Sequence, residues 1–248
     1  MSDSEAARLP PPLIALVIPA LNEEAVISAT LRRIPAGLFG VVVVVDNGST
    51  DATARLAREC GAVVVSEPRR GYGAACIRAL AALPPRTEIV VFMQADGSED
   101  PAQASRLIAP ILNGCADLVL GSRVLGKSAP GAVLPHQRLG NWLAVTLVRW
   151  CFRHSYTDLG PFRAVRMEAL RSLEMRDRGY GWTIEMQVRA IQQGLRIVEV
   201  PVDYCQRVAG ANKVSGSPTA SLLAGVKIIS TILRLAIRSD RTKPRSTV

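Results

Sequence analysis

The residues best suited to chemistry in this chain directly follow a run of valines. Residues 41–45 are all valine, and the next six spell DNGSTD, from Asp46 to Asp51. An unbroken β-branched run is typical of a strand buried on both faces of a sheet, and such a polar cluster ends a strand and caps a helix. Ligands of open parallel α/β sheets bind beyond the carboxyl ends of the strands, where helix-start amides can hold an anion. The layout suits a nucleotide, although Asp46 could equally be a turn-forming, capping carboxylate.

A second candidate phosphate loop is Arg69-Arg70-Gly71-Tyr72-Gly73, which precedes a helical pattern. Two guanidinium groups can pair with a diphosphate, and two glycines allow its close approach to the backbone. A glycine-rich turn with solvated arginines is the alternative. No G-x-G-x-x-G follows the first predicted strand, which argues against a dinucleotide-binding oxidoreductase.

These polar segments interrupt an alternation of short apolar strands and helical patterns. Repeated strand–helix units imply an α/β fold with a mainly parallel, Rossmann-like sheet flanked by helices. The predicted strands are residues 13–18, 41–45, 62–66, 89–93 and 118–121, and the predicted helices are 23–34, 51–60, 72–83 and 101–112. After Ser122 the alternation ends. We expect helices at 138–154 and 182–193, strands at 162–165 and 195–204, a basic glycine-containing loop at 206–217 and a long helix at 218–238.

Composition favours one domain with a basic C-terminal end. The chain has 248 residues, of which 48% are hydrophobic, enough for one large core. Its formal net charge is +9, and residues 203–248 hold eight basic and two acidic side chains. Such a field favours nucleic acid, an anionic membrane surface or phosphorylated substrates. Because aromatic residues make up only 4% of the chain, we expect no nucleic-acid partner.

The cysteine and histidine content limits the site further. Five cysteines are scattered singly, without a C-x-x-C pair, so neither a disulfide framework nor a thiolate zinc site is expected, and a reducing cytosol fits. His136 and His154 do not form a ligand pair, so any metal should be bound by oxygen. We see no signal peptide and no apolar run of about 18 residues, and therefore predict no transmembrane segment.

Four segments, in this order, resemble the motifs of family 2 glycosyltransferases with the GT-A fold. They are residues 18–24 (IPALNEE), 45–51 (VDNGSTD), 94–98 (QADGS) and 157–163 (TDLGPFR). The resemblance covers about residues 13–235 and is nearest to the polyprenol-phosphate (dolichol-phosphate-like) hexosyltransferase branch. It implies a flexible lead at 1–12, a catalytic domain at 13–217, an amphipathic helix at 218–238 and a basic tail at 239–248. Within the domain, 13–122 would form the nucleotide-sugar half and 123–217 the acceptor half.

The resemblance implies a nucleotide-sugar site with a divalent cation. Gln94-Ala95-Asp96 stands where the family usually has Asp-x-Asp, so Asp96, helped by Ser98 and the donor's diphosphate, is the predicted ligand of Mg²⁺ or Mn²⁺. Glu99 could substitute as a ligand, whereas Asp100, just before Pro101, is expected to cap a helix. The predicted nucleotide-sugar-binding residues are Pro19, Asn22, Glu23, Asp46, Asn47, Gly71, Gly73, Gln94 and Asp96.

The catalytic residues implied by the resemblance are Asp158, Arg123 and Arg163. Arg123 would hold phosphate, and Asp158 would act as a base or align the acceptor. A phosphate acceptor, whose second pKa is about 6, is largely deprotonated at neutral pH, so alignment should matter more than proton abstraction. Alternatively, Asp158 pairs structurally with Arg163 or Arg166.

Three further features complete the predicted site. Arg207 and Lys213 resemble a mobile loop that contacts the donor and acceptor phosphates. Glu185 and Gln187 would lie near the sugar pocket, or would form only a polar helix face. On the terminal helix one stripe is basic, as in an interfacial helix or a basic edge packed on the core; its members are Lys227, Arg234, Arg238 and Arg241.

Together these features predict inverting transfer of a hexose from a UDP- or GDP-sugar to a polyprenol phosphate or similar lipid. The enzyme would be cytoplasmic and peripheral at the inner face of an anionic membrane, with a homo-oligomer as a further option. One alternative is transfer to a soluble acceptor, with the terminal helix as core or dimer contact. Another, motivated by Gln94, is a nucleotide-sugar-binding protein with weakened catalysis.

Overall fold

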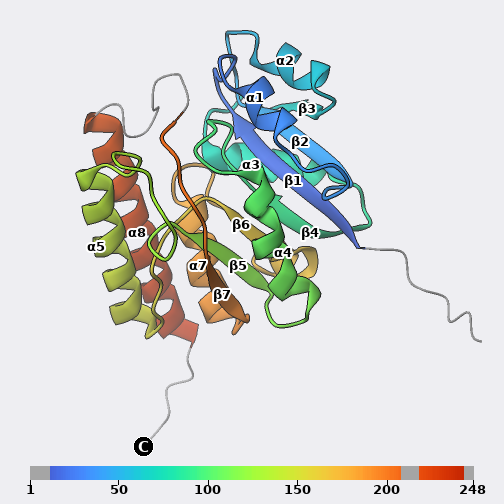
Figure 1. Cartoon of the computed structure of the whole chain (residues 1–248). Coiled ribbons are helices and arrows are strands. Elements are labelled where there is room, and N and C mark those ends of the chain that lie inside the picture. The colour runs from blue at the N-terminus through green and yellow to red at the C-terminus, as the bar shows by residue number, and fades with distance from the viewer. Residues whose placement is uncertain (1–11, 208–217, 243–248) are drawn as a thin grey trace, which may run out of the picture.

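The fold is built on one seven-stranded sheet (Figure 1). The computed structural model describes residues 12–207 and 218–242. The strand order is β3-β2-β1-β4-β6-β5-β7, and all pairs are parallel except those of β6 with β4 and β5. The expected mainly parallel sheet is thus confirmed. The strands are β1 Leu13–Ala20, β2 Val41–Asp46, β3 Val63–Ser66, β4 Thr87–Phe92, β5 Leu118–Ser122, β6 Arg163–Arg166 and β7 Ile197–Pro201.

Helices cover both faces of the sheet, as a sheet with continuous apolar strands requires. The helices are α1 Ile27–Arg32, α2 Thr53–Glu59, α3 Tyr72–Ala82, α4 Ala104–Leu112, α5 Pro135–Phe152, α6 Met167–Ser172, α7 Trp182–Gln192 and α8 Pro218–Thr242, with a 3₁₀ turn η1 at Pro101–Gln103. Alternate residues of β1 face opposite sides, so that Val17 packs in one buried cluster and Leu16 in the other. Helices α3 and α7 contribute to the first cluster and α4 to the second.

The structure tests two predictions at helix starts, of which one changes. The helix expected at 23–34 begins only at Ile27, because Asn22 has a positive φ of 49° and a turn closed by Val26 N donating to Glu23 O precedes it. Asn22 is therefore not a helix cap. Asp100 caps η1 as expected, since its Oδ1 accepts a hydrogen bond of 3.2 Å from the Ala102 amide.

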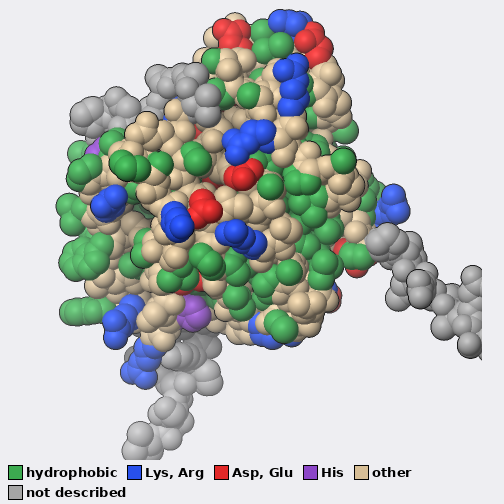
Figure 2. All heavy atoms as spheres, viewed as in Figure 1, with side chains coloured by type: hydrophobic (Ala, Val, Ile, Leu, Met, Phe, Trp, Pro, Cys, Tyr) green, Lys and Arg blue, Asp and Glu red, His purple; other side chains and the backbone are tan. Residues whose placement is uncertain are grey.

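Helices α5 and α8 lie side by side and form the outer layer over α7 (Figure 1). Their outward surface is strongly apolar, and Figure 2 shows hydrophobic atoms gathered on that side of the molecule. Exposed residues on α5 are Leu139, Trp142, Leu143 and Trp150, and those on α8 are Leu222, Leu223, Val226, Leu233 and Ile237. Among the helices described, none combines the length and hydropathy needed to cross a bilayer.

Candidate active site

The loops that follow β1 and β2 form one hydrogen-bonded unit. In the sheet, Ala20 pairs in register with Asp46, so the two loops start side by side. Asn22 Oδ1 accepts from the Thr50 amide at 2.8 Å, and the Asn22 amide donates to Ser49 Oγ at 2.9 Å. Asn22 therefore joins the two motifs, a role that the sequence did not reveal.

Asp46 ends β2 at this junction, where a nucleotide was predicted. Its Oδ1 accepts the Ser49 amide at 3.2 Å, as the turn-forming alternative requires. Within the described residues its Oδ2 has no hydrogen-bond donor, which leaves that oxygen available to a ligand hydroxyl. Pro19, opposite Val45 in the sheet register, is also partly exposed here.

Asn47 holds the next loop in place. Its Nδ2 donates to the carbonyls of Glu67 (3.0 Å) and Arg69 (2.7 Å), and its Oδ1 accepts from the Gly71 amide (2.8 Å). The side chain is 6% exposed. Because main-chain groups occupy its amide, the predicted direct nucleotide contact of Asn47 is replaced by a positioning role for residues 67–71.

Gly71 and Gly73 are needed for close packing, but not against a diphosphate. A Cβ on Gly71 or Gly73 would collide with the carbonyl oxygen of Arg178 or Asp177. The Ala74 amide donates to Arg178 O at 2.9 Å and the Gly73 amide to Gly179 O at 3.3 Å. The first turn of α3 is thus capped by the chain's own 177–179 loop. The predicted backbone cradle at these glycines is therefore wrong.

The predicted metal position lies beyond β4. Asp96 is 8% exposed, and its Oδ1 accepts from the Ser98 amide (3.1 Å) and from Ser98 Oγ (2.5 Å). Ser98 thus orients Asp96. The other oxygen, Oδ2, lies 3.4 Å from Nη1 of Arg207.

Arg207 brings two donor-side loops together. Besides Asp96, its guanidinium contacts both carboxylate oxygens of Glu23 through Nη2. Glu23 is 7% exposed, and its amide donates to Thr53 Oγ1 at 2.7 Å. The Arg207 guanidinium therefore lies between two nearly buried carboxylates. A cation at this position could also pair with a bound diphosphate. Lys213 lies outside the described residues.

Glu99 is a buried carboxyl behind this position. Its Oε2 accepts from the Gln94 amide at 2.8 Å, and its Oε1 is buried without a partner among the described residues. Burial raises the pKa of Glu99 to about 8, and the nearby Asp96 charge adds to that rise. The group is therefore mostly protonated at neutral pH.

These residues fit a divalent cation that is held largely by the phosphates of a bound substrate. The described residues contain no group of three or more His, Cys, Asp or Glu able to hold a metal by themselves. Magnesium commonly uses one or two carboxylates plus substrate phosphates. Asp96 can supply one carboxylate. Close by, Oε1 of Glu99 is buried without a hydrogen-bond partner among the described residues.

Asp158 and Arg123 form a bidentate pair on the acceptor side. Arg123 Nε and Nη2 donate to Asp158 Oδ2 and Oδ1, both at 2.7 Å, and the Arg123 amide donates to Oδ2 at 2.9 Å. Burial lowers the pKa of Arg123, but Asp158 outweighs it and the net shift is upward. The Arg123 guanidinium also stacks over the Tyr204 ring at 5.2 Å. Asp158 thus has an arginine partner, but not Arg163 or Arg166 as the structural alternative supposed.

Arg163 is in the core and does not face the site. It is 0% exposed, and its two Nη groups donate to the carbonyls of Thr183 (3.0 Å) and Gly160 (2.5 Å). Burial lowers its pKa. The predicted catalytic contact of Arg163 is wrong, and its contact with Gly160 instead fixes the loop that carries Asp158.

The two polar residues predicted near the sugar have separate surroundings. Gln187 is fully buried, and its Nε2 donates to the Asp158 carbonyl at 3.2 Å. Glu185 accepts from the amides of Arg176 (3.0 Å) and Asp177 (2.6 Å), so it supports a different loop. Neither side chain is an exposed polar helix face, and Glu185 does not contact Asp158.

A cavity of about 440 Å³ adjoins the Asp158–Arg123 pair. It lies between the loop after β5 and helix α5, and its walls combine two guanidinium groups with apolar side chains. Its lining includes Arg123, Arg138, Asn141, Trp142, Val145 and Asp158. The sequence did not single out Arg138 or Trp142, because no motif marks them.

On α8, the basic side chains of Lys227 and Arg234 pair with a buried carboxylate while staying partly exposed. Lys227 Nζ lies 2.9 Å and Arg234 Nη2 3.8 Å from Oδ2 of Asp177, which is 5% exposed. At these two residues the stripe forms a basic edge packed beside Asp177, as the alternative expected, and contact of the stripe with a membrane stays a prediction. The side chains of Arg238 and Arg241 lie outside the described residues.

Comparison with known proteins identifies the family of the chain. The model of the family described as glycosyl transferase family 2 matches residues 15–174. An uncharacterised glycosyltransferase of Mycobacterium tuberculosis is 41% identical over 213 residues, covering 85% of this chain and 94% of that protein. The undecaprenyl-phosphate mannosyltransferase of Micrococcus luteus is 30% identical over 229 residues, covering 86% of this chain and 92% of that protein.

A solved structure is similar over nearly the whole fold. It is the glucosyl-3-phosphoglycerate synthase of Mycobacterium tuberculosis in complex with Mn²⁺, UDP-glucose and phosphoglyceric acid, with a TM-score of 0.75 and 28% identity over 96% of this chain and 83% of that one. The similarity confirms the expected GT-A architecture. The chain belongs to glycosyl transferase family 2, a family of sugar-transferring enzymes.

Proposed function

We propose that this enzyme transfers a hexose, with inversion, from a UDP- or GDP-sugar to the phosphate of a polyprenol phosphate or similar lipid, with Mg²⁺ or Mn²⁺ as cofactor. The observation that carries the proposal is the position of Arg207. Its guanidinium contacts both Glu23 and Asp96 at the edge of the sheet where β2 ends with Asp46. A nucleoside diphosphate bound at this edge would have its ribose near Asp46 and its phosphates near Arg207 and Asp96.

The residues present suit attack by an acceptor oxygen that is already charged. The acceptor phosphate oxygen forms a bond to the anomeric carbon, while the bond from that carbon to the diphosphate oxygen breaks and its electron pair leaves with the nucleoside diphosphate. Arg207 offsets the charge that builds on the leaving group. A divalent cation on Asp96, when bound, supplies further charge neutralisation there.

Asp158 has an aligning role in this proposal. Both of its oxygens accept from Arg123, which makes it a good anchor for a phosphate-binding guanidinium. Since an acceptor phosphate is largely deprotonated at neutral pH, no base is required.

A lipid acceptor is favoured by the surroundings of the acceptor cavity. Trp142 lines the cavity and is also 60% exposed on the apolar surface that α5 shares with α8. An acceptor phosphate near Arg123 and Arg138 would then have its apolar tail beside that surface. The similarity to an undecaprenyl-phosphate mannosyltransferase supports the same acceptor class, with the enzyme peripheral at the inner face of a membrane.

A soluble phosphate acceptor is the second candidate. The observation in its favour is the likeness to glucosyl-3-phosphoglycerate synthase, solved with phosphoglyceric acid, which spans 96% of this chain. The Arg123 site would suit that phosphate equally well, and the apolar surface would then have another purpose.

The test is a direct competition between acceptors. Purified protein is incubated with Mn²⁺ and radiolabelled UDP-glucose or GDP-mannose, together with detergent-dispersed undecaprenyl phosphate and 3-phosphoglycerate, and both products are separated and counted. We expect label in the lipid phase, and an Asp96→Asn variant should lose it. Label found solely in the glycosylated phosphoglycerate, whichever donor is used, would contradict the lipid proposal.

The weakened-enzyme alternative has its own outcome. If neither product forms although calorimetry detects nucleotide-sugar binding, a Gln94→Asp variant is assayed in the same way. A large gain of transfer from that undetectable baseline would favour the nucleotide-sugar-binding protein.

A further inference from the structure

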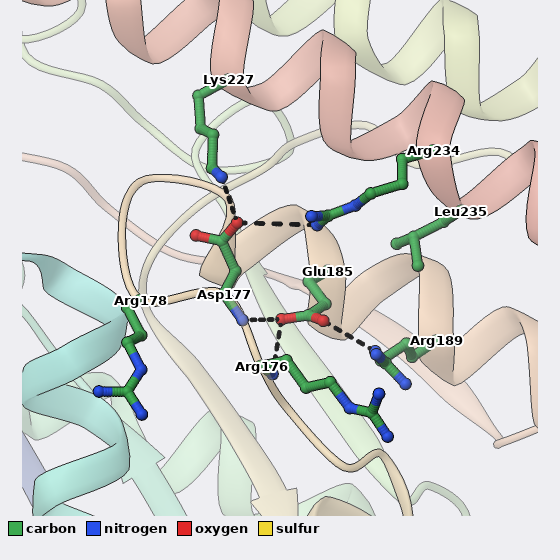
Figure 3. A pocket seen from close by; sticks show the side chains of 8 residues that line it. All are labelled: Arg176, Asp177, Arg178, Glu185, Arg189, Lys227, Arg234 and Leu235. Atoms are coloured by element: carbon green, nitrogen blue, oxygen red, sulfur yellow. Dashed lines mark hydrogen bonds and ion pairs between the residues drawn. The ribbon is translucent and has the colours of Figure 1, made fainter.

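A second cavity, of about 290 Å³, lies between the loop at 176–178 and helices α7 and α8 (Figure 3). It shares no residue with the Asp96 and Asp158 sites. Five of its lining side chains are cationic and two are carboxylates; the cations are Arg176, Arg178, Arg189, Lys227 and Arg234. Its walls therefore carry a formal excess of positive charge.

The two carboxylates, Asp177 and Glu185, are already satisfied within the protein. Glu185 is 1% exposed and accepts from the amides of Arg176 and Asp177 and from Arg189 Nε at 2.9 Å. Asp177 Oδ1 accepts from the Gly179 amide at 2.8 Å. These buried acids hold the loop and orient the surrounding cations, so they are not themselves vacant sites for a cation.

The cations keep N–H donors that no acceptor among the described residues occupies. Lys227 and Arg234 share one oxygen of Asp177, at 2.9 and 3.8 Å, although their side chains are 42% and 47% exposed. In Figure 3 both reach down from α8 toward Asp177, with Arg189 on the facing helix, whereas Arg178 points away from the two carboxylates. A guanidinium has five N–H donors, and the ion pair that Arg234 makes with Asp177 within the described residues is a long one, at 3.8 Å.

A buried hydroxyl on the same face of α8 also lacks a partner. Thr231 lies four residues after Lys227 and three before Arg234, so the three side chains share one helix face. Its Oγ1 is buried without a hydrogen-bond partner in the described part of the chain. A Cβ on Gly181 would press against both this oxygen and Asp177 Oδ2, so the hydroxyl is close to the ion pairs.

We propose that this cavity is a binding site for a phosphate group, held chiefly by Lys227, Arg234 and Arg189. A tetrahedral anion offers several acceptor oxygens to donors that converge from two helices, and guanidinium groups suit it geometrically. The volume admits a phosphate or small phosphomonoester rather than a nucleotide sugar. The phosphate could belong to a small soluble molecule or to an anionic lipid headgroup, and the site does not depend on which acceptor the enzyme uses.

Calorimetric titration with inorganic phosphate tests the soluble source. The variant is Arg234→Gln, whose ion pair with Asp177 is long enough for the fold to survive, as a thermal melt would verify. The matched control is Arg55→Gln, which removes an exposed arginine that pairs with Glu59 on α2. Loss of one charge-assisted hydrogen bond should weaken the affinity for phosphate about tenfold or more, while the control should match the parent protein.

Sedimentation with vesicles tests the lipid source. Phosphatidylcholine vesicles with and without phosphatidylglycerol are compared for the same three proteins. Binding that needs phosphatidylglycerol and falls in Arg234→Gln, but not in Arg55→Gln, would assign the site to a headgroup. If Arg234→Gln binds both inorganic phosphate and phosphatidylglycerol vesicles as the parent does, or if the parent binds neither, the proposal is overturned. Because these are binding measurements, the result is independent of the transferase assay.

Discussion

Arg207, just beyond β7, contacts both carboxylate oxygens of Glu23, just beyond β1, and thereby joins segments 184 residues apart in the sequence. The same guanidinium lies 3.4 Å from Asp96 Oδ2. Without a ligand this cation compensates two nearly buried acids. In the proposed function the same charge would meet the diphosphate of a bound donor, so that one side chain would serve both stability and transfer.

Replacing Arg207 should therefore impair transfer and stability together. In Arg207→Gln we expect kcat to fall by about 100-fold or more, because a preorganised donor to the leaving group is lost. Two acids left without their cation should also lower the free energy of unfolding, by up to about 3 kcal/mol. Steady-state kinetics and denaturant unfolding measure both effects, and unchanged kcat would show that Arg207 is only a structural cation.

Asp96 should be the protein group on which the response to Mn²⁺ depends. In Asp96→Asn we expect the Mn²⁺-dependent rise in melting temperature with UDP to disappear and turnover to fall at least about 100-fold, while the metal-free protein stays folded. Asp100→Asn is the matched control, since that carboxylate only caps η1 and pairs with Arg33. The control should lose about 1 kcal/mol of stability and keep its Mn²⁺ response. A normal response in Asp96→Asn would place the cation elsewhere.

The sequence was sufficient for most of the sheet and for the strand ends that carry the donor site. The valine run at 41–45 and the polar residues after it specify a buried strand and its carboxyl edge, and Asp46 lies there. The antiparallel insertion of β6 between β4 and β5 was not predictable, because the sequence of a four-residue strand does not indicate with which strands it pairs.

Side-chain partners from distant segments were the main source of error. The motif residues Asp158 and Arg163 are five apart, yet Asp158 pairs with Arg123 and Arg163 is buried against carbonyls. Likewise, the spacing of Lys227 and Arg234 predicts a common stripe but not the side it faces, which is fixed by Asp177. Such choices depend on tertiary contacts that the local pattern does not encode.

Gly73 offers a test of packing against ligand binding. Gly73→Ala should destabilise the protein by about 1–3 kcal/mol, because the new methyl group collides with the Asp177 carbonyl oxygen. Gly140→Ala is the control. A Cβ added at this position within α5 would have no neighbouring atom within 4 Å, so the substitution should be neutral or stabilise the protein by up to about 1 kcal/mol. Equilibrium unfolding compares them. A raised KM for the nucleotide sugar with unchanged stability would instead restore the diphosphate cradle.

Glu99 should make the stability of the metal-free protein depend on pH. Its folded-state pKa is raised from 4.5 to about 8, so its contribution is full below about pH 4.5 and is lost as the pH rises through 8. Within that window the limiting slope is about 1.4 kcal/mol per pH unit. Melting temperatures from pH 5 to 8 with chelator present should fall for the parent protein and fall less for Glu99→Gln. Parallel curves would mean that Glu99 is already ionised in the fold.

Asp158→Asn separates alignment from base catalysis. The substitution removes a bidentate ion pair whose carboxylate side chain is 2% exposed and whose arginine side chain is 18% exposed, so we expect a loss of about 3 kcal/mol in stability. If Asp158 aligns Arg123, KM for the acceptor should rise and the pH dependence of kcat should keep its shape, because the acceptor phosphate supplies its own charged oxygen. A base would instead give a variant in which kcat falls steeply and the acidic limb of the pH profile disappears. Arg123→Lys completes the test, because it keeps the charge but loses the fork geometry. Under the aligning role it should reproduce the KM effect of Asp158→Asn, whereas with a base at 158 the two variants should differ, since only Asp158→Asn would lose the acidic limb.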